Sequence, residues 1–155
     1  MSLVRAKDTQ PELILRRYLH KAGYRYRLHV KSLPGKPDLV FPRRKAALFV
    51  NGCFWHGHQC HRFSWPRTRE TFWRNKILGN KERDRRNQQD LIRAGWRVGV
   101  VWGCALQGKG KLGIDTVAAE CQRWLDSSEP VLSVSGLTAM RDAESIPISV
   151  EGPQN

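Results

Sequence analysis

One short segment of the chain holds most of its metal-binding and proton-transfer groups. Between Asn51 and His61 the sequence carries two cysteines, three histidines and an adjacent pair of aromatic residues. Zinc accepts mixed sulfur and nitrogen ligands in a tetrahedral arrangement, so thiols and imidazoles this close in sequence favour a zinc site. Cys104 and Cys121 lie elsewhere and could complete a set of four ligands. The spacing matches no common zinc finger, and buried free thiols beside exposed histidines are the alternative at this point.

Disulfide pairing is the other alternative for the cysteines. The sequence shows no secretory signal and no apolar run of transmembrane length, so we expect a cytosolic protein without a membrane partner. Structural disulfides are rare in the cytosol. Metal ligands are therefore the better interpretation of the four cysteines.

The chain is strongly basic, with 27 lysines and arginines against 14 acidic residues, a net charge of +13 and a pI near 10.3. The excess lies within residues 1–126, whereas residues 127–155 are net acidic. Basic residues gather between positions 67 and 86, around Phe72 and Trp73. No basic helix with a continuous apolar face accompanies them, so nucleic acid is favoured over a membrane surface, with a merely solubilising surface as the alternative.

Hydrophobic periodicity and turn residues outline an α/β protein. Thr9 to Glu12 form a capping box, which predicts the start of an amphipathic helix that ends at Gly23. The chain up to 126 reads as one domain with a mixed sheet between helices, and 127–155 as an acidic, flexible tail. The other expected elements are strands over 24–30, 37–41, 46–50 and 97–102, a helix over 67–94 broken near Gly79, and a last helix over 112–125.

Asp38 is the acidic residue that is the strongest candidate for a chemical role. It opens an apolar strand, where a carboxylate is costly to bury unless it is paired or binds a cation. An aspartate that only caps the preceding turn is the commoner arrangement. Glu12 on a helix, Asp38 on a strand and a second strand ending near position 50 resemble the core of the PD-(D/E)XK nucleases, which bind Mg²⁺ through oxygen ligands and hydrolyse phosphodiesters. Where that motif has its second acid and lysine, this chain has Val50-Asn51-Gly52.

Several longer motifs resemble the very-short-patch repair (Vsr) DNA mismatch endonucleases over roughly residues 5–125. Enzymes of this family nick a duplex beside the thymine of a T:G mismatch that arises when 5-methylcytosine is deaminated. The resemblance implies a restriction-endonuclease-like three-layer sandwich around a mixed sheet, with a structural zinc site. The motifs are LPGKPD at 33–38, FVNGCFWHGHQC at 49–60, RTRETFW at 67–73, KERDRR at 81–86, GWRV at 95–98 and VWGCAL at 101–106.

The resemblance also implies the catalytic groups. Asp38 matches the family's magnesium-binding aspartate, and Val50 stands where the family uses a backbone carbonyl as a further ligand. His56 matches the catalytic histidine, and imidazole groups as a class exchange protons near neutral pH. Glu12 matches an auxiliary acid, although a helix-capping role is compatible with it. Asn51 stands where some relatives have a histidine.

The implied structural zinc ligands are Cys53, His58, Cys60 and Cys104. A zinc ion held by these residues would fix the segment that carries His56 to a distant strand. Two candidates are then left over. We expect Cys121 to belong to the core, because it has helical spacing from Trp124, and His61 to lie on the surface.

The remaining implied residues contact DNA. Phe54, Trp55 and Trp73 match aromatic side chains that the family inserts beside the mismatch, and Arg67 and Arg69 belong to the basic surface. Two consecutive large rings in a metal-bound loop cannot easily both point inward. An apolar wedge unstacks bases, and a mispaired step is the easiest to open.

Together these expectations describe a magnesium-dependent, zinc-stabilised nicking endonuclease that acts as a monomer on double-stranded DNA containing a T:G mismatch. Its expected location is the bacterial cytosol, associated with the nucleoid, with a functional link to a cytosine-5 DNA methyltransferase. One alternative is a nuclease of the same fold that cuts matched duplex. The other is a non-catalytic zinc-bearing DNA-binding module in which Asp38 only caps a turn.

Overall fold

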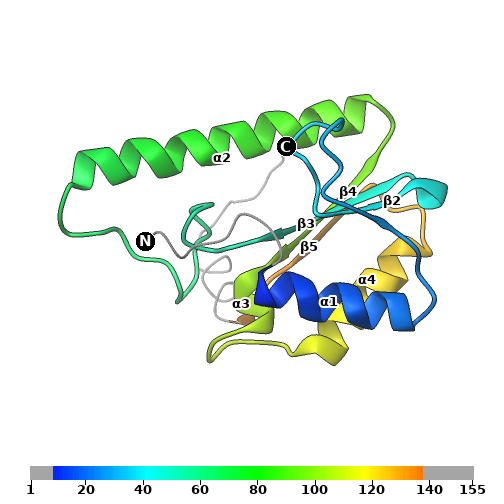
Figure 1. Ribbon diagram of the computed structural model, residues 1–155. Coiled ribbons are helices and arrows are strands. Elements are labelled where there is room, and N and C mark those ends of the chain that lie inside the picture. Colours follow the sequence, from blue (N-terminus) through cyan, green and yellow to red (C-terminus); the bar gives the residue numbers. More distant parts are fainter. Residues whose placement is uncertain (1–8, 138–155) are drawn as a thin grey trace.

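The computed structural model describes residues 9–137, which form a five-stranded mixed sheet with helices on both faces (Figure 1). The strands lie in the order β1-β2-β3-β4-β5; β1, β2 and β3 are antiparallel, and β3, β4 and β5 are parallel. Helix α2 crosses one face, and α1 and α4 cover the other. The elements are α1 (Gln10–Lys21), β1 (Arg27–Leu28), β2 (Leu39–Phe41), the 3-10 turn η1 (Pro42–Arg44), β3 (Ala46–Asn51), α2 (Glu70–Arg93), β4 (Arg97–Trp102), α3 (Gly103–Leu106), α4 (Ile114–Leu125) and β5 (Val131–Val134).

The central strand β3 divides the core into two apolar layers. Successive side chains of a strand point to opposite faces, and β3 is apolar on both. Leu48 packs with the α1 and α4 side, whereas Ala47 and Phe49 pack with Leu91 of α2 on the other. Burial on both faces explains why β3 reads as a continuous apolar run rather than as an alternating one.

Helix α1 begins as the sequence predicts and carries an acid into the interior. The hydroxyl of Thr9 accepts a hydrogen bond from the backbone N–H of Glu12 at 3.4 Å, and a proline stands in the first turn. Leu15 and Leu19 are fully buried against the sheet. Glu12 is only 1% exposed, so α1 places a carboxyl group in the protein interior.

Helix α2 is continuous over 24 residues, so the expected break near Gly79 was wrong. A glycine in a helix interior costs about 1 kcal/mol relative to alanine, which packing on either side can outweigh. Ile77 and Leu91 are buried on the inner side of α2. The amide of Asn80 also donates a hydrogen bond to the carbonyl of Trp55 at 2.9 Å. None of the helices within residues 9–137 is long and apolar enough to span a membrane.

The strand expected over 24–30 is reduced to Arg27–Leu28. Tyr24 instead packs into the core, and its hydroxyl donates to Asp126 at 2.8 Å. His29 ends the strand because its φ of 50° lies in the left-handed region, where a β ladder cannot continue. The short helix α3 was not predicted. The other expected helices and strands of residues 9–126 are confirmed to within a few residues.

The described part of the expected tail belongs to the fold. Val131–Val134 form β5, which pairs in parallel with β4. Leu132 and Val134 are buried, and Val131 is 55% exposed. Strand β5 was not predicted because it is a short edge strand in which only two residues point inward, and two residues make too weak an alternating pattern in the sequence. The domain therefore continues past residue 126, and the expectation for 138–155 lies outside the described residues.

Strand β5 offers a matched test of this correction. Leu132→Ala should lower the free energy of unfolding by about 2 kcal/mol or more, because it leaves a cavity under α4. Val131→Ala, one position away on the solvent side, should change it by less than about 0.5 kcal/mol. Urea denaturation of both variants measures the difference, and equal small effects would show that β5 does not contribute to the core.

Candidate active site and metal centre

Asp38 lies immediately before β2 and faces the end of β3. Its Oδ2 accepts a hydrogen bond from the backbone N–H of Val50 at 2.7 Å, and its side chain is only 13% exposed. Burial raises the pKa of Asp38 to about 7 despite this hydrogen bond, and the nearby carboxyl of Glu12 raises it further. Two histidines, His29 and His56, act in the opposite direction. Asp38 is thus a largely buried acid whose Oδ2 is hydrogen-bonded to the end of β3.

A cavity of about 250 Å³ opens beside this carboxyl group. Asp38 and Val50 line it from the sheet, and His56 lines it from the segment after β3. Asp84 on α2 closes it opposite, with its Oδ2 2.5 Å from Nδ1 of His56. Asn51, buried at the end of β3, also lines the cavity. The structure therefore brings Asp38, Val50 and His56 together, as expected.

Asp84 was not predicted as a site residue. In the sequence it stands among lysines and arginines on a long polar helix, so it reads as one member of a surface charge pattern. Only the packing of α2 over the end of β3 brings it to His56. Its place in the KERDRR motif at 81–86 was the available signal.

Glu12 lies on the other side of Asp38, joined to it through a residue that the sequence analysis missed. Nε2 of His29 is 3.0 Å from Oε2 of Glu12, and its Nδ1 is 3.7 Å from Oδ1 of Asp38. Arg16 also pairs with Glu12 at 3.1 Å. Strand alternation would have put His29 with Arg25 and Arg27 on the solvent side, and the positive φ of His29 overrides that pattern.

The expected metal ligands form a second cluster, next to the aromatic segment. One ligand atom from each of Cys53, His58, Cys60 and Cys104 lies within 4.8 Å of all the others. Cys104 comes from α3, directly after β4, while the other three come from the segment after β3. All four cysteines of the chain are free thiols, which agrees with the expectation against disulfides.

The polar contacts of this cluster suit anionic sulfur. The backbone N–H of Cys104 donates to Sγ of Cys53 at 3.3 Å, and that of Gly136 donates to Sγ of Cys104 at 3.2 Å. The pKa of Cys104 falls to about 4, mainly because the Cys53 thiol donates to it, with His58 adding to the effect. The pKa of Cys53 is raised, because its thiol donates a hydrogen bond to Cys104 and because it is buried. One thiolate is thus stabilised without a cation, and a dication would be needed to ionise all three sulfurs together.

The position of His58 completes the fit to a tetrahedral cation. His58 stacks on Trp102 with ring centroids 4.1 Å apart, which fixes the imidazole plane, and its Nδ1 lies 3.6 Å from Sγ of Cys104. Three thiols and one imidazole match the donor set of a structural zinc site. Because Gly136 follows β5, the described end of the chain also contributes to the cluster.

Cys121 and His61 are the two residues left outside the expected zinc site. Cys121 is fully buried in the core, as predicted. His61 is not a surface residue, because both of its ring nitrogens are buried without a hydrogen-bond partner among the described residues. It packs beside Gly108, where a Cβ would lie 2.7 Å from its Nε2. The glycine makes room for the ring.

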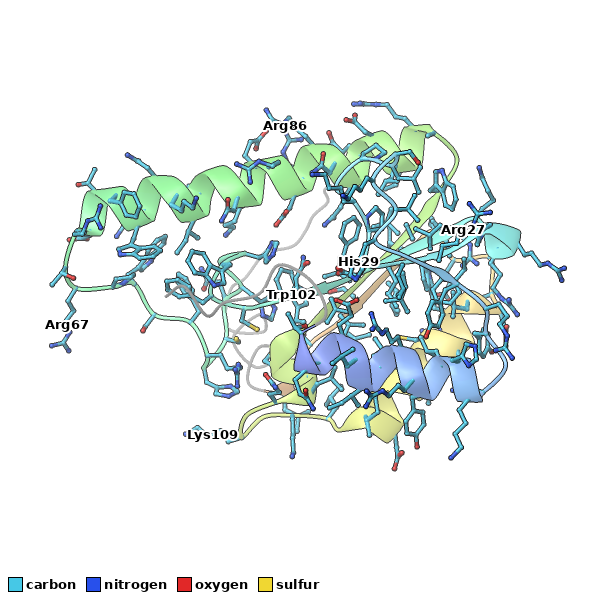
Figure 2. All side chains as sticks on the ribbon, in the orientation of Figure 1. Arg27, His29, Arg67, Arg86, Trp102 and Lys109 are labelled. Atoms are coloured by element: carbon cyan, nitrogen blue, oxygen red, sulfur yellow. The ribbon has the colours of Figure 1, made fainter. Side chains whose placement is uncertain are left out.

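The aromatic residues expected to contact DNA form one partly exposed cluster under the start of α2. The rings of Phe54, Trp55 and Trp73 lie 5.2 to 5.6 Å from one another. The guanidinium of Arg69 lies 4.2 Å from the ring of Phe72. Arg67 projects from the loop before α2, at the same end of the molecule (Figure 2). The same cluster includes Phe63 and Trp65, which were not singled out from the sequence.

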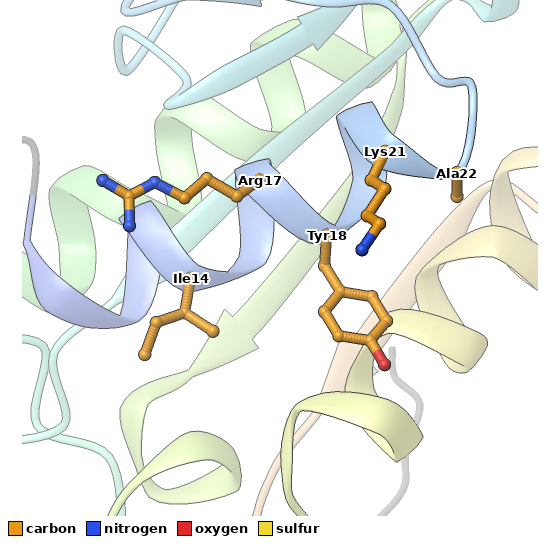
Figure 3. A pocket seen from close by; sticks show the side chains of 5 residues that line it. All are labelled: Ile14, Arg17, Tyr18, Lys21 and Ala22. Carbon is orange, nitrogen blue, oxygen red and sulfur yellow. The ribbon is translucent and has the colours of Figure 1, made fainter.

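A larger hollow of about 520 Å³ lies away from these groups, on the outer side of α1 (Figure 3). Ile14, Arg17, Tyr18, Lys21 and Ala22 line it, so its lining offers neither a carboxylate nor a metal ligand. The hydroxyl of Tyr18 is already engaged by Asp115 of α4. Size therefore does not identify the chemical site here, and we place it at the smaller cavity.

The metal centre makes a prediction about the purified protein. Cys60→Ser should lower the bound zinc and the melting temperature together, because metal binding and local folding share one free energy. Cys121→Ser is the matched control: it puts a hydroxyl into the core and should destabilise the fold while full zinc content is kept. Elemental analysis and thermal melting measure both quantities. Full zinc in Cys60→Ser with an unchanged melting temperature would show that the ligand assignment is wrong.

Comparison with known proteins agrees with this geometry. The sequence profile of the family described as DNA mismatch endonuclease Vsr matches residues 1–62. The chain is 52% identical over 112 residues to the type II nicking enzyme V.XorIIP of Xanthomonas oryzae pv. oryzae, covering 72% of this chain and 82% of the relative. It is 41% identical over 125 residues to the DNA mismatch endonuclease Vsr of Escherichia coli K12, covering 81% of this chain and 80% of that enzyme. The chain belongs to the Vsr family of DNA mismatch endonucleases.

Proposed function

We propose that the protein is a magnesium-dependent endonuclease that nicks one strand of duplex DNA at a T:G mismatch. One observation carries the proposal: a largely buried carboxyl, a strand-end backbone and a carboxylate-paired histidine line one cavity, next to a partly exposed aromatic cluster. Asp38, Val50, His56 and Asp84 supply the first three features. Membership of a mismatch endonuclease family supports the assignment.

Asp38 and the backbone carbonyl of Val50 would hold the magnesium ion. In an extended strand the N–H and C=O of one residue project to the same edge. Since the N–H of Val50 points to Asp38, its carbonyl is expected to turn the same way, giving two oxygen ligands of the kind that Mg²⁺ prefers. Bound there, the cation would act as a Lewis acid on the phosphate. The raised pKa of Asp38 shows that its ionised form lacks sufficient compensating charge, which a bound cation would supply.

His56 would take the proton from the attacking water. The carboxylate of Asp84 faces Nδ1, which favours the tautomer that leaves Nε2 as the proton acceptor. Asn51 in the same cavity is an amide, which donates hydrogen bonds and does not titrate. The side chain of His56 is therefore the proton acceptor that we assign to this cavity, and Glu12 is an auxiliary acid behind Asp38.

The aromatic cluster would give the mismatch specificity. Phe54, Trp55 and Trp73 are partly exposed beside the cavity, with basic residues along α2 and the loop before it. Insertion of rings into the base stack costs least at a mispaired step. Arg67 and Arg69 would contact the phosphate backbone, whose affinity for basic residues falls with added salt.

We also propose a fold type, a structural metal, an oligomeric state and a cellular location for the protein. The three layers and the position of Asp38 support a restriction-endonuclease-like sandwich, and the sulfur-rich cluster supports structural zinc. We propose that a monomer nicks the DNA in the bacterial cytosol, at the nucleoid, and that its work is linked to a cytosine-5 DNA methyltransferase. The relatives named as nicking enzymes support cleavage of one strand.

The pH dependence of stability tests the magnesium ligand. The native pKa of Asp38 is about 7 against an ordinary 3.8, so between these values the folded protein keeps a proton that the unfolded chain releases. This group's contribution to stability is therefore present at low pH and is lost as pH rises toward 7. Since Mg²⁺ competes with the proton, it should raise the melting temperature more at about pH 8 than at about pH 6. Equal shifts at both pH values, or the same shifts in Asp38→Asn, would exclude Asp38 as the ligand.

Nicking of a T:G duplex tests the proposed activity directly. Asp38→Asn should abolish nicking while DNA binding stays nearly intact, because it removes an anionic magnesium ligand and leaves the basic surface unchanged. His56→Ala should slow nicking by about 10²–10⁴-fold if it is the general base. Asp90→Asn, which removes an exposed acid of α2 paired with Arg93, is the control.

Single-turnover assays of T:G, T:A and C:G duplexes, with Mg²⁺ or EDTA, separate the candidate functions. Nicking confined to T:G supports the proposal. Equal cleavage of matched duplex would favour a general nuclease of the same fold. A wild-type rate for Asp38→Asn, or binding without any cleavage, would favour a zinc-bearing DNA-binding module.

A further inference from the structure

His29 lies between two carboxyl groups that come from different elements. Glu12 belongs to α1, Asp38 precedes β2, and His29 directly follows β1, on the segment that leads from β1 to β2 (Figure 2). All three side chains are largely withdrawn from solvent, with exposed fractions of 2% for Glu12, 13% for Asp38 and 18% for His29. Two acids this close and this buried repel each other when both are ionised.

The backbone holds His29 at this position independently of its ring. Its N–H donates to the carbonyl of Asp38 at 3.0 Å, so the two residues are joined by main chain as well as by side chains. Its φ of 50° turns the ring away from the outward direction that the strand pattern of β1 would give. A non-glycine residue keeps this conformation only where its surroundings determine it.

The orientation of the ring distinguishes two possible roles. Nε2 faces Glu12 at 3.0 Å, and the other nitrogen, Nδ1, faces Asp38 at 3.7 Å. A histidine that binds a metal presents one nitrogen to the cation together with the other ligands. One ligand atom from each of Glu12, His29 and Asp38 lies within 4.8 Å of the others, so the three could also hold a cation together. Each ring nitrogen faces a different carboxyl group, however, which is the arrangement of a bridge between two acids.

We propose that His29 is a positioning residue that bridges Glu12 and Asp38 and so holds both carboxyl groups in place for a divalent cation at Asp38. This inference rests on the proposed function. Nδ1 of the ring faces Oδ1 of Asp38, while the N–H of Val50 holds Oδ2. The carboxyl group of Asp38 is thereby oriented from two sides. Groups that orient metal ligands in this way typically change metal affinity by about 10–100-fold when they are lost.

The bridge is distinct from a general role in folding. Arg16 pairs with Glu12 as well, and the fully buried Leu15 and Leu19 attach α1 to the sheet. Removing the ring should therefore leave α1 in place but free the two carboxyl groups to move apart. Cation affinity should change much more than thermal stability in the absence of the cation.

The test measures the binding of Mn²⁺, as a substitute for Mg²⁺, to the zinc-loaded protein in complex with T:G duplex. Electron paramagnetic resonance gives the affinity, and pulsed measurements detect any nitrogen bonded to Mn²⁺. The variants are His29→Ala and His29→Gln, in which glutamine keeps amide donors without the ring. His20→Ala, which removes an exposed histidine of α1, is the control. Melting temperatures are recorded without added Mn²⁺ or Mg²⁺.

We expect His29→Ala to weaken Mn²⁺ binding by about tenfold or more, His29→Gln to recover part of the loss, and His20→Ala to bind as the wild type does. Melting temperatures should be nearly equal. Unchanged Mn²⁺ affinity in both His29 variants would overturn the inference. A nitrogen signal that disappears in His29→Ala but persists in His56→Ala would also overturn it, because His29 would then be a ligand. Weaker binding in His29→Ala by a protein that never nicks DNA would uphold the bridge and refute the proposed function.

Discussion

The hydrogen bond from the backbone of Val50 to Asp38 connects the structural and chemical parts of this protein. It joins the start of β2 to the end of β3 and holds a carboxyl group in the interior, where burial raises its pKa to about 7. Strand β3 is covered by helices on both faces, so Val50 is fixed by the core rather than by a flexible loop. The same strand leads within two residues of its end to Cys53, the first thiol of the metal centre. The positions of both sites therefore depend on one strand.

The metal centre extends this constraint to the segment after β3. Cys104 follows the neighbouring strand β4, so a cation bound to Cys53, His58, Cys60 and Cys104 would tie the segment to both strands at once. His56 and the aromatic pair Phe54 and Trp55 lie between the first two of these ligands. A segment without regular structure can in this way present a proton acceptor and partly exposed rings at defined positions. Asp84 of α2 holds His56 from the opposite side.

Sequence reasoning identified residues that lie in short continuous motifs and missed residues that only packing brings to the site. The four sulfur and nitrogen ligands and the aromatic residues were singled out because their motifs resemble those of the Vsr family, and Asp38 also because a carboxylate at the start of an apolar strand is unusual; the structure brings the four ligand atoms together. Asp84 and His29 were missed, since one looks like a surface charge on a basic helix and the other like the outward residue of a strand. Their positions beside His56 and Asp38 arise only because α2 crosses the sheet and because His29 adopts a positive φ. Strand β5 was missed because two inward residues are too weak a pattern, and Gly79 was taken for a break because its local propensity was not weighed against the packing of the whole helix.

The central claim is that a divalent cation at Asp38 contacts the phosphate that is cleaved. Replacing a non-bridging oxygen of that phosphate by sulfur in a T:G duplex tests it most directly, because Mg²⁺ binds sulfur poorly and softer cations such as Mn²⁺ or Cd²⁺ bind it well. The account predicts that one of the two sulfur diastereomers is nicked slowly in Mg²⁺, that Mn²⁺ or Cd²⁺ restores the rate, and that Asp38→Asn shows no such recovery. Equal nicking of the oxygen and sulfur substrates in Mg²⁺, or recovery in Asp38→Asn as large as in the wild type, would contradict it.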